Sequence, residues 1–153
     1  MPIKEKINNF KENFNDEFEY EIKSILKQQQ DFHPITTELD TPLKDIILNY
    51  TKGGKRIRPF LIHFFAEDGD EKILKELCIA SELFHLAALI HDDIMDESDM
   101  RRNVPTLHTA TQKFSKKNNH LGTDIALLLG DVFLTASIAI VAHLPSNIFT
   151  EFT

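Results

Sequence analysis

Three aspartates near the middle of the sequence have the spacing that most strongly suggests chemistry. Residues 85–96 read His-Leu-Ala-Ala-Leu-Ile-His-Asp-Asp-Ile-Met-Asp. At about 3.6 residues per turn, Asp92 and Asp96 lie one helical turn apart and share a narrow sector with His85. Asp93 projects toward another side of the helix. Like charges one turn apart repel, and Asp is unfavourable inside a helix, so helix formation does not explain these residues.

A divalent cation would relieve the repulsion between Asp92 and Asp96. Mg²⁺ takes oxygen ligands, keeps several waters and bridges to substrate phosphates. The alternative is a solvated acidic helix end, but the helix dipole favours carboxylates at the start of a helix and not at its finish. We therefore predict a Mg²⁺ site at Asp92 and Asp96.

Two basic elements flank these acids. Arg101 and Arg102 follow them and could supply forked donors to a diphosphate, although pairing with nearby surface acids is equally compatible with the sequence. Upstream, residues 52–59 read Lys-Gly-Gly-Lys-Arg-Ile-Arg-Pro. Paired glycines let backbone N–H groups approach an anion, and Lys55 and Arg58 could face one site at a helix start. The glycine spacing does not match a nucleotide P-loop.

The elements that must position these residues are predicted to be helices. Apolar residues recur every three or four positions along residues 3–26, which indicates one long helix. A break is predicted around Pro34, and a second helix is predicted to start at residues 40–42. Further helices are predicted near 58–66, over 71–95 with a cap at Asp70, and after 118–119. Residues 97–105 are predicted to be a polar loop. The predicted fold class is all-α, a helical bundle.

Composition supports an ordinary globular chain. The 153 residues are 42% hydrophobic and carry a net charge of −7, so a global basic field that would attract nucleic acid is missing. A lone Cys78 excludes an internal disulfide and fits a reducing cytoplasm. Residues 125–144 are nearly all apolar, but Asp131 inside this stretch favours the central helix of a soluble bundle over a transmembrane segment. The charged first 30 residues do not resemble a signal peptide.

Taken together, the motifs resemble those of the trans-isoprenyl (polyprenyl) diphosphate synthases in order and spacing. The resemblance rests on Gly-Gly-Lys-Arg-Ile-Arg-Pro at 53–59, His85, Asp-Asp-Ile-Met-Asp at 92–96, the paired arginines at 101–102 and Pro-Thr at 105–106. It covers about residues 40–140. It implies that residues 1–153 are the amino-terminal half of a single all-α prenyltransferase domain of the isoprenoid synthase type, cytoplasmic and homodimeric.

The resemblance also implies roles for individual residues. Asp92 and Asp96 would bind the Mg²⁺ ions that hold an allylic diphosphate, and Asp93 would support this catalytic cluster. Arg101 would contact the allylic diphosphate. The expected ligands of isopentenyl diphosphate are Lys55, Arg58, His85 and Arg102. Without the family, His85 is better interpreted as an ordinary core histidine.

Two departures limit what the resemblance implies. Asn103-Val104 stands where family members commonly have Gly-Lys. The second aspartate-rich motif of the family lies in a later half that this sequence does not contain, so we expect the 153-residue chain alone to be inactive or nearly so. A non-catalytic small subunit or regulatory fragment that partners a full synthase is the alternative. A terpene cyclase would have no reason to keep the isopentenyl-binding element, and a plain helical scaffold would not need the convergent charges.

Product length can also be predicted from the family. The residues four and five before Asp92, Ala88 and Ala87, are expected at the floor of the product cavity, with Phe84 one turn deeper. Because both alanines are small, we expect a product of geranylgeranyl length or longer.

Overall fold

The computed structural model describes residues 2–32, 37–66, 68–114 and 116–146. Within these ranges the chain forms six helices and one short hairpin, which confirms the all-α class. In chain order the elements are α1 (Ile3–Phe32), α2 (Thr37–Thr51), α3 (Ile57–Phe65), α4 (Glu71–Met95), β1 (Met100–Arg101), β2 (Val104–Pro105), α5 (Leu107–Gln112) and α6 (Leu121–Ala142).

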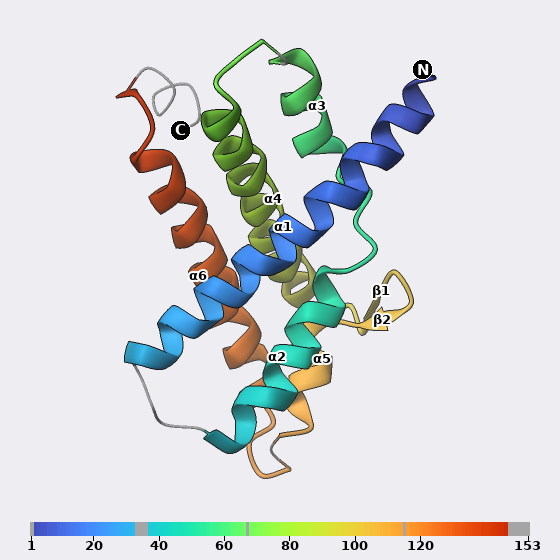
Figure 1. The fold of residues 1–153 in the computed structure, drawn as a ribbon. Coiled ribbons are helices and arrows are strands. Elements are labelled where there is room, and N and C mark those ends of the chain that lie inside the picture. Colours follow the sequence, from blue (N-terminus) through green and yellow to red (C-terminus); the bar gives the residue numbers. More distant parts are fainter. Residues whose placement is uncertain (1, 33–36, 67, 115, 147–153) are drawn as a thin grey trace.

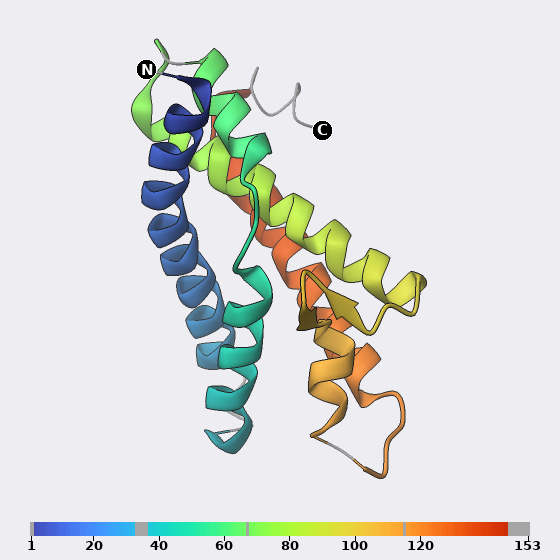
Figure 2. The ribbon, with the colours of Figure 1, turned by 90° about the vertical axis from the view of Figure 1, so that its right-hand side faces the viewer.

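The helices form two layers. α4 and α6 pack against each other as one layer, and α5 packs on α6. α1 and α2 form the second layer, and α3 connects the two at one end (Figure 2). In the view of Figure 1, α1 crosses in front of α4 and α6. The start of α4 lies near α3, and its carboxyl end, where the aspartates lie, points away from α3 (Figure 2).

Periodic apolar residues fill the space between the layers. The stripe predicted on α1 is buried from Phe14 to Ile25, and α4 contributes Leu83 and Ile90, both at most 1% exposed. α6 adds Phe133, which is completely buried. These side chains belong to one continuous cluster, so the two layers share a single core.

The start of α2 is where the sequence-based prediction was wrong. A start at residues 40–42 was expected because proline favours the first turn, but α2 begins at Thr37 and contains Pro42 inside it. Proline removes one helix hydrogen bond. Pro42 is exposed, while Ile47 and Tyr50 further along are buried in the core, and this tertiary packing outweighs the local cost. The expected break at Pro34 lies outside the described residues.

The limits of α4 agree with the prediction. The Oδ1 atom of Asp70 accepts a hydrogen bond of 3.0 Å from the backbone N–H of Ile73, which caps the start of the helix. The helix ends at Met95, and the backbone N–H of Asp96 still donates to the carbonyl of Asp92 at 2.8 Å. The aspartate motif therefore occupies the last turn of α4.

In the described part of the chain, α6 is the one helix long and apolar enough to cross a membrane, with a mean hydropathy of 2.3. Its inner face packs in the bundle through Ala126, Phe133 and Val141, none of which is exposed. Ser137 on the same face donates a 2.8 Å hydrogen bond to the carbonyl of Ala80 on α4. The core helix of a bundle can have this length and composition, so they do not by themselves indicate a membrane span.

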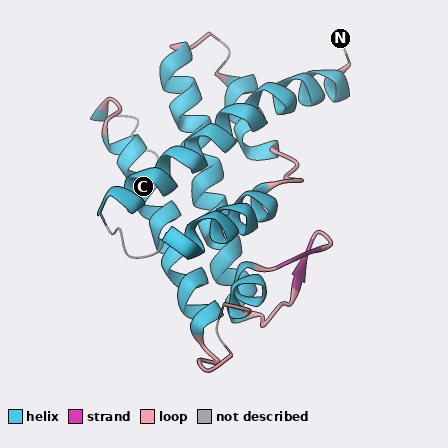
Figure 3. Ribbon diagram, turned by 60° about the horizontal axis from the view of Figure 1, so that its bottom comes forward, coloured by secondary structure: helices cyan, strands magenta, loops and turns pink. Residues whose placement is uncertain are grey.

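The predicted polar loop contains a two-strand hairpin that the sequence did not reveal. β1 and β2 pair antiparallel, with Arg101 opposite Val104 (Figure 3). Arg102 and Asn103 connect the strands and have positive φ angles of 51° and 66°. Positive φ at both central residues is characteristic of the tight turns that suit β-hairpins, and Asn tolerates this conformation well.

Candidate active site

The three aspartates at the end of α4 have two different environments. Asp92 and Asp96 are exposed, and the side chain of Asp92 retains 59% of its accessible surface. Asp93 points into the protein and is only 2% exposed. The predicted separation of Asp92 and Asp96 from Asp93 therefore holds in the structure, and only the exposed pair is open to a ligand in solvent.

Asp93 is held by a tyrosine and an arginine. Tyr50 on α2 donates a 2.6 Å hydrogen bond to Oδ2 of Asp93. Arg101 on β1 donates to Oδ1 of Asp93 from Nε at 2.7 Å, and its Nη2 lies 2.6 Å from the same oxygen. Burial, followed by the hydrogen bond to Asp93, raises the pKa of Tyr50 far above its ordinary value, so the phenol stays protonated and keeps donating. These contacts support Asp93 as a structural member of the cluster.

Arg101 serves the aspartates themselves. Its Nη2 also lies 3.4 Å from Oδ2 of Asp92, so one guanidinium bridges the buried and the exposed acid. The hydrogen bond to Asp93 raises the pKa of Arg101 further. The sequence predicted that Arg101 would contact a diphosphate; in this structure its Nε and Nη2 are engaged by Asp93 and Asp92.

Two of the remaining predicted cations, Arg58 and Arg102, act electrostatically on His85. Burial lowers the pKa of His85, Arg58 lowers it next, Glu82 raises it, and Arg102 and Arg101 lower it by smaller amounts. Arg58 belongs to α3 and the other two arginines to the hairpin, so positive charge from two separate segments reaches this imidazole on α4. Lys55 is exposed in the loop that leads to Arg58. A cluster of cations beside two exposed acids can bind an anion that also carries a metal ion.

The paired glycines have a structural role that the sequence did not reveal. Gly53 has a φ of 76°, which a residue with a side chain adopts only with strain. A Cβ atom on Gly54 would lie 2.7 Å from Nη1 of Arg56, so Gly54 makes room for this buried guanidinium. The sequence suggested that the glycines admit an anion; the structure shows that Gly54 admits Arg56.

Sequence reasoning missed three residues that organise the site. Tyr50, Arg56 and Glu82 were not predicted as site residues. The available signal was Glu82, a carboxylate inside the apolar stretch of α4 between Leu77 and Ile90. A charge at such a position needs a buried partner, and Arg56 is the partner. The sequence alone does not indicate which of the clustered cations pairs with it.

The exposed acids fit part of a magnesium shell. Asp92 and Asp96 offer carboxylate oxygens one turn apart, and Mg²⁺ commonly uses one or two carboxylates together with waters and substrate phosphates. Asp93 is committed to Tyr50 and Arg101. Among the described residues, no group of three or more His, Cys, Asp or Glu side chains is arranged to hold a metal ion. The described residues therefore offer Asp92 and Asp96 as two candidate ligands for Mg²⁺.

The face of α4 that carries Asp92 continues away from the acids as an open apolar surface. Ala88 is exposed one turn before Asp92, and Phe84 is 50% exposed one turn further. Ala87 is only 2% exposed and belongs to the core. Of the two alanines predicted at a cavity floor, only Ala88 lies on the open face, because neighbouring positions of a helix point about 100° apart.

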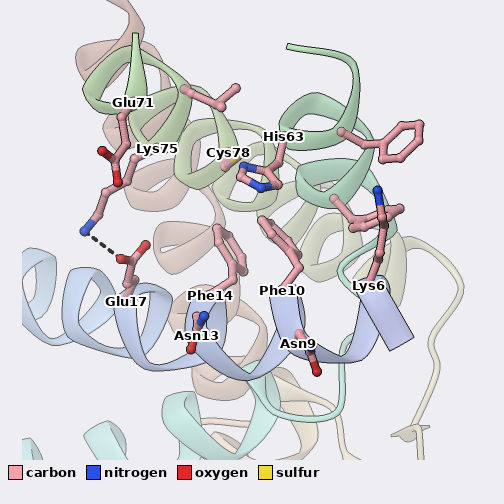
Figure 4. A pocket seen from close by; sticks show the side chains of 13 residues that line it. Lys6, Asn9, Phe10, Asn13, Phe14, Glu17, His63, Glu71, Lys75 and Cys78 are labelled. Carbon is pink, nitrogen blue, oxygen red and sulfur yellow. Dashed lines mark hydrogen bonds and ion pairs between the residues drawn. The ribbon is translucent and has the colours of Figure 1, made fainter. Parts of the chain in front are cut away.

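A separate cavity of about 450 Å³ lies at the opposite end of α4, between α1, α3 and the start of α4 (Figure 4). The rings of Phe10, Phe14 and His63 line it, and Lys75 pairs with Glu17 at 2.8 Å along its edge. None of the predicted site residues lines this cavity. It is therefore distinct from the charged cluster at the carboxyl end of α4.

Replacing Tyr50 with Phe tests the support of Asp93. The variant removes the phenolic donor and leaves a buried carboxylate oxygen without it, which costs about 1–3 kcal/mol of unfolding free energy. Tyr20, the other tyrosine of the chain, is 73% exposed, so Tyr20→Phe is a matched control that should stay within about 0.5 kcal/mol. Urea denaturation measures both. Equal stability of the two variants would show that the buried bond does not hold Asp93.

His85 should make stability depend on pH. Because its pKa is lowered in the folded state, the unfolded chain binds a proton first as the pH falls through about 6.5, so this contribution to stability is complete above that pH and declines below it. Between pH 7.5 and pH 5.5, the melting temperature of His85→Gln should fall less than that of the original protein. His120→Gln, at an exposed position, is the control and should leave the pH profile unchanged. Parallel profiles for all three proteins would contradict the lowered pKa.

Comparison with known proteins identifies the family of this chain. The family model described as polyprenyl synthetase matches residues 40–153. Geranylfarnesyl diphosphate synthase of Methanosarcina mazei is 34% identical over 77% of this chain and 38% of its own length. Nonaprenyl diphosphate synthase of Mycobacterium tuberculosis is 32% identical over 70% of this chain and 30% of its own length. This chain thus spans well under half the length of these relatives.

Solved structures share the fold. Geranylgeranyl pyrophosphate synthase of Corynebacterium glutamicum, solved in complex with isoprenyl diphosphate and magnesium, is 27% identical with a TM-score of 0.62. The match covers 90% of this chain and 41% of that structure. Because the family model matches more than half of the sequence, this chain belongs to the polyprenyl synthetase family.

Proposed function

We propose that this chain provides the first half of the active centre of a Mg²⁺-dependent trans-prenyltransferase, which condenses isopentenyl diphosphate with an allylic diphosphate. The observation that carries the proposal is the meeting of opposite charges at one end of α4. Asp92 and Asp96 are exposed, Arg101 lies 3.4 Å from Asp92, and Arg58 and Arg102 act electrostatically on His85, two turns before Asp92. Such a site suits a ligand that is itself an anion bound to a cation.

The two diphosphates are assigned to different parts of this surface. Asp92 and Asp96 hold the allylic diphosphate through Mg²⁺, and Arg101 fixes the aspartates and borders the same ligand. Lys55, Arg58, His85 and Arg102 bind isopentenyl diphosphate. Arg58, Arg102 and Lys55 are all exposed, which leaves their charged ends accessible to phosphate oxygens.

The proposed reaction depends on charge stabilisation and on positioning. The C–O bond of the allylic diphosphate breaks, and its electron pair leaves with pyrophosphate. The isopentenyl double bond supplies the pair for the new C–C bond, and loss of a proton restores an alkene. Asp92 and Asp96 would hold Mg²⁺, which would supply positive charge next to the departing pyrophosphate. The arginines supply further fixed positive charge. In the whole protein, the apolar face next to Asp92 would form one wall of a site that limits the access of water to the allylic carbocation.

The number of acids that can bind Mg²⁺ affects whether residues 1–153 are active on their own. The chain spans 30–38% of the length of the two synthases compared above. We propose that a second set of acids completes the Mg²⁺ site in the whole protein, and that a polypeptide of residues 1–153 alone condenses the two substrates slowly or not at all. The homodimeric state and cytoplasmic location implied by the family remain part of this proposal.

Replacing the exposed aspartates tests the metal site. Asp92→Asn and Asp96→Asn should each abolish the gain in affinity for an allylic diphosphate that Mg²⁺ confers, because each removes a charged oxygen ligand. Calorimetric titration with Mg²⁺, and again after addition of EDTA, measures this gain. In the whole protein, turnover should fall by about 10²–10³. Asp16→Asn, at an exposed position on α1, is the matched control. The same Mg²⁺ dependence in all variants would refute the proposed site.

The open face of α4 suggests what limits the product. Ala88 and Phe84 extend from Asp92 along one face, so a growing prenyl chain that starts at the metal site runs over them. Ala88 is too small to block it. We propose a product of geranylgeranyl length or longer, with Phe84 as the first large side chain that the product meets. Ala87 lies in the core and takes no part.

Two single variants of the whole protein, Ala88→Phe and Ala87→Phe, test this assignment. Ala88→Phe should shorten the product, because the new ring stands one turn from Asp92 on the open face. Ala87→Phe inserts a ring into a packed core, so it should lower stability by about 1–3 kcal/mol and leave the product of the remaining folded enzyme unchanged. Chain lengths are read by mass spectrometry. Shortening by Ala87→Phe alone would reverse the assignment.

A further inference from the structure

One cation of the basic segment 52–58 is buried between two exposed ones. Lys55 and Arg58 face solvent, whereas Arg56 is only 7% exposed. Burying a guanidinium is unfavourable unless hydrogen bonds and an opposite charge compensate for lost water. Arg56 therefore cannot act as a surface ligand for an anion, and its position needs a structural explanation.

Every donor nitrogen of Arg56 has a partner from a different part of the fold. Nη1 lies 2.5 Å from Oε1 of Glu82 on α4, in an ion pair whose two side chains are 6% and 8% exposed. Nε donates to Oδ1 of Asn15 on α1 at 2.9 Å, and Nη2 donates to the carbonyl of Thr51 on α2 at 2.8 Å. The guanidinium also stacks 4.7 Å from the ring centre of Phe18. One side chain thus joins α1, α2 and α4.

These contacts fix the backbone of the segment. Arg56 has a φ of 53°, in the left-handed region that is strained for a residue with a side chain. Its carbonyl accepts a 3.1 Å hydrogen bond from the N–H of Phe60, which starts α3. Gly54 has no Cβ, which leaves space for the guanidinium. The strained conformation persists because the side chain is held on all sides.

Glu82 connects this anchor to the charged cluster. It precedes His85 by three residues on α4, so the two lie on neighbouring turns of one side of the helix. Arg58 follows Arg56 by two residues and affects His85 electrostatically. The anchor is therefore within two residues of Lys55 and Arg58 along the chain and three residues from His85 on α4.

We propose that Arg56 is a positioning residue, which through Glu82 holds segment 52–58 against α4 so that Lys55 and Arg58 meet the same diphosphate as His85. The inference rests on the proposed function, since it concerns how the isopentenyl diphosphate site is built. Arg56 itself does not touch the substrate. Its removal should weaken binding of isopentenyl diphosphate while the Mg²⁺-dependent binding of the allylic diphosphate at Asp92 persists.

The double variant Arg56→Met/Glu82→Leu tests the proposal in the whole protein. Replacing both partners of a buried ion pair with apolar residues often preserves stability, so the fold should be retained while the anchor is lost. Calorimetry should show affinity for isopentenyl diphosphate reduced about tenfold or more, and affinity for the allylic diphosphate with Mg²⁺ changed less than about threefold, since tenfold corresponds to about 1.4 kcal/mol. Asn15→Ala, which removes a single partner, should weaken isopentenyl diphosphate binding in the same direction by a smaller factor.

Lys72→Met/Glu76→Leu is the matched control. It removes an exposed pair of one cation and one anion, both on α4, whose nitrogen and oxygen are 3.9 Å apart. Lys72 is 83% exposed, so this variant should alter the affinity for neither diphosphate. Unchanged isopentenyl diphosphate binding in the Arg56 double variant would overturn the positioning role. If that variant does not fold, Asn15→Ala decides the question, and unchanged binding there has the same meaning. Failure of the original protein to bind either diphosphate would instead refute the proposed function.

Discussion

The ion pair between Arg56 and Glu82 is the contact on which the arrangement of the helices around the site depends. It is buried where α1, α2 and α4 approach one another, and breaking such a pair from one side costs about 3–5 kcal/mol because the other charge stays behind without water. A helix bundle can tolerate sliding of one apolar face over another. The guanidinium of Arg56 has three directional partners, which prevent such sliding. It therefore fixes the relative positions of α1, α2 and α4.

A second polar contact repeats this principle at the other end of the site. Tyr50 and Arg101 hold Asp93, and Arg101 extends to Asp92. The two adjacent acids thus have different roles: the buried Asp93 binds protein groups, and the exposed Asp92 stays available to a ligand. The division follows from helix geometry, because consecutive residues point about 100° apart and cannot face the same environment.

Periodic features could be predicted from the sequence, and long-range pairings could not. The limits of α4, its cap at Asp70 and the exposed positions of Asp92 and Asp96 follow from local patterns. The start of α2 was wrong because packing further along the helix outweighed Pro42. The partners of Glu82 and Asp93 lie 26 and 43 residues away, and several cations or hydroxyls could have filled those roles. Only the folded arrangement selects Arg56 and Tyr50.

The hairpin between α4 and α5 decides how two neighbouring arginines are used. Arg101 lies in β1 and points to Asp93, whereas Arg102 lies in the turn, where its positive φ turns it to solvent. The loop has only two residues, so there is no slack in which the arginines could exchange places. Inserting a single residue here would disturb the pairing of Arg101 with Val104, and the register of the two strands would shift. The length of this turn is therefore as much a part of the charge pattern as the identity of its residues.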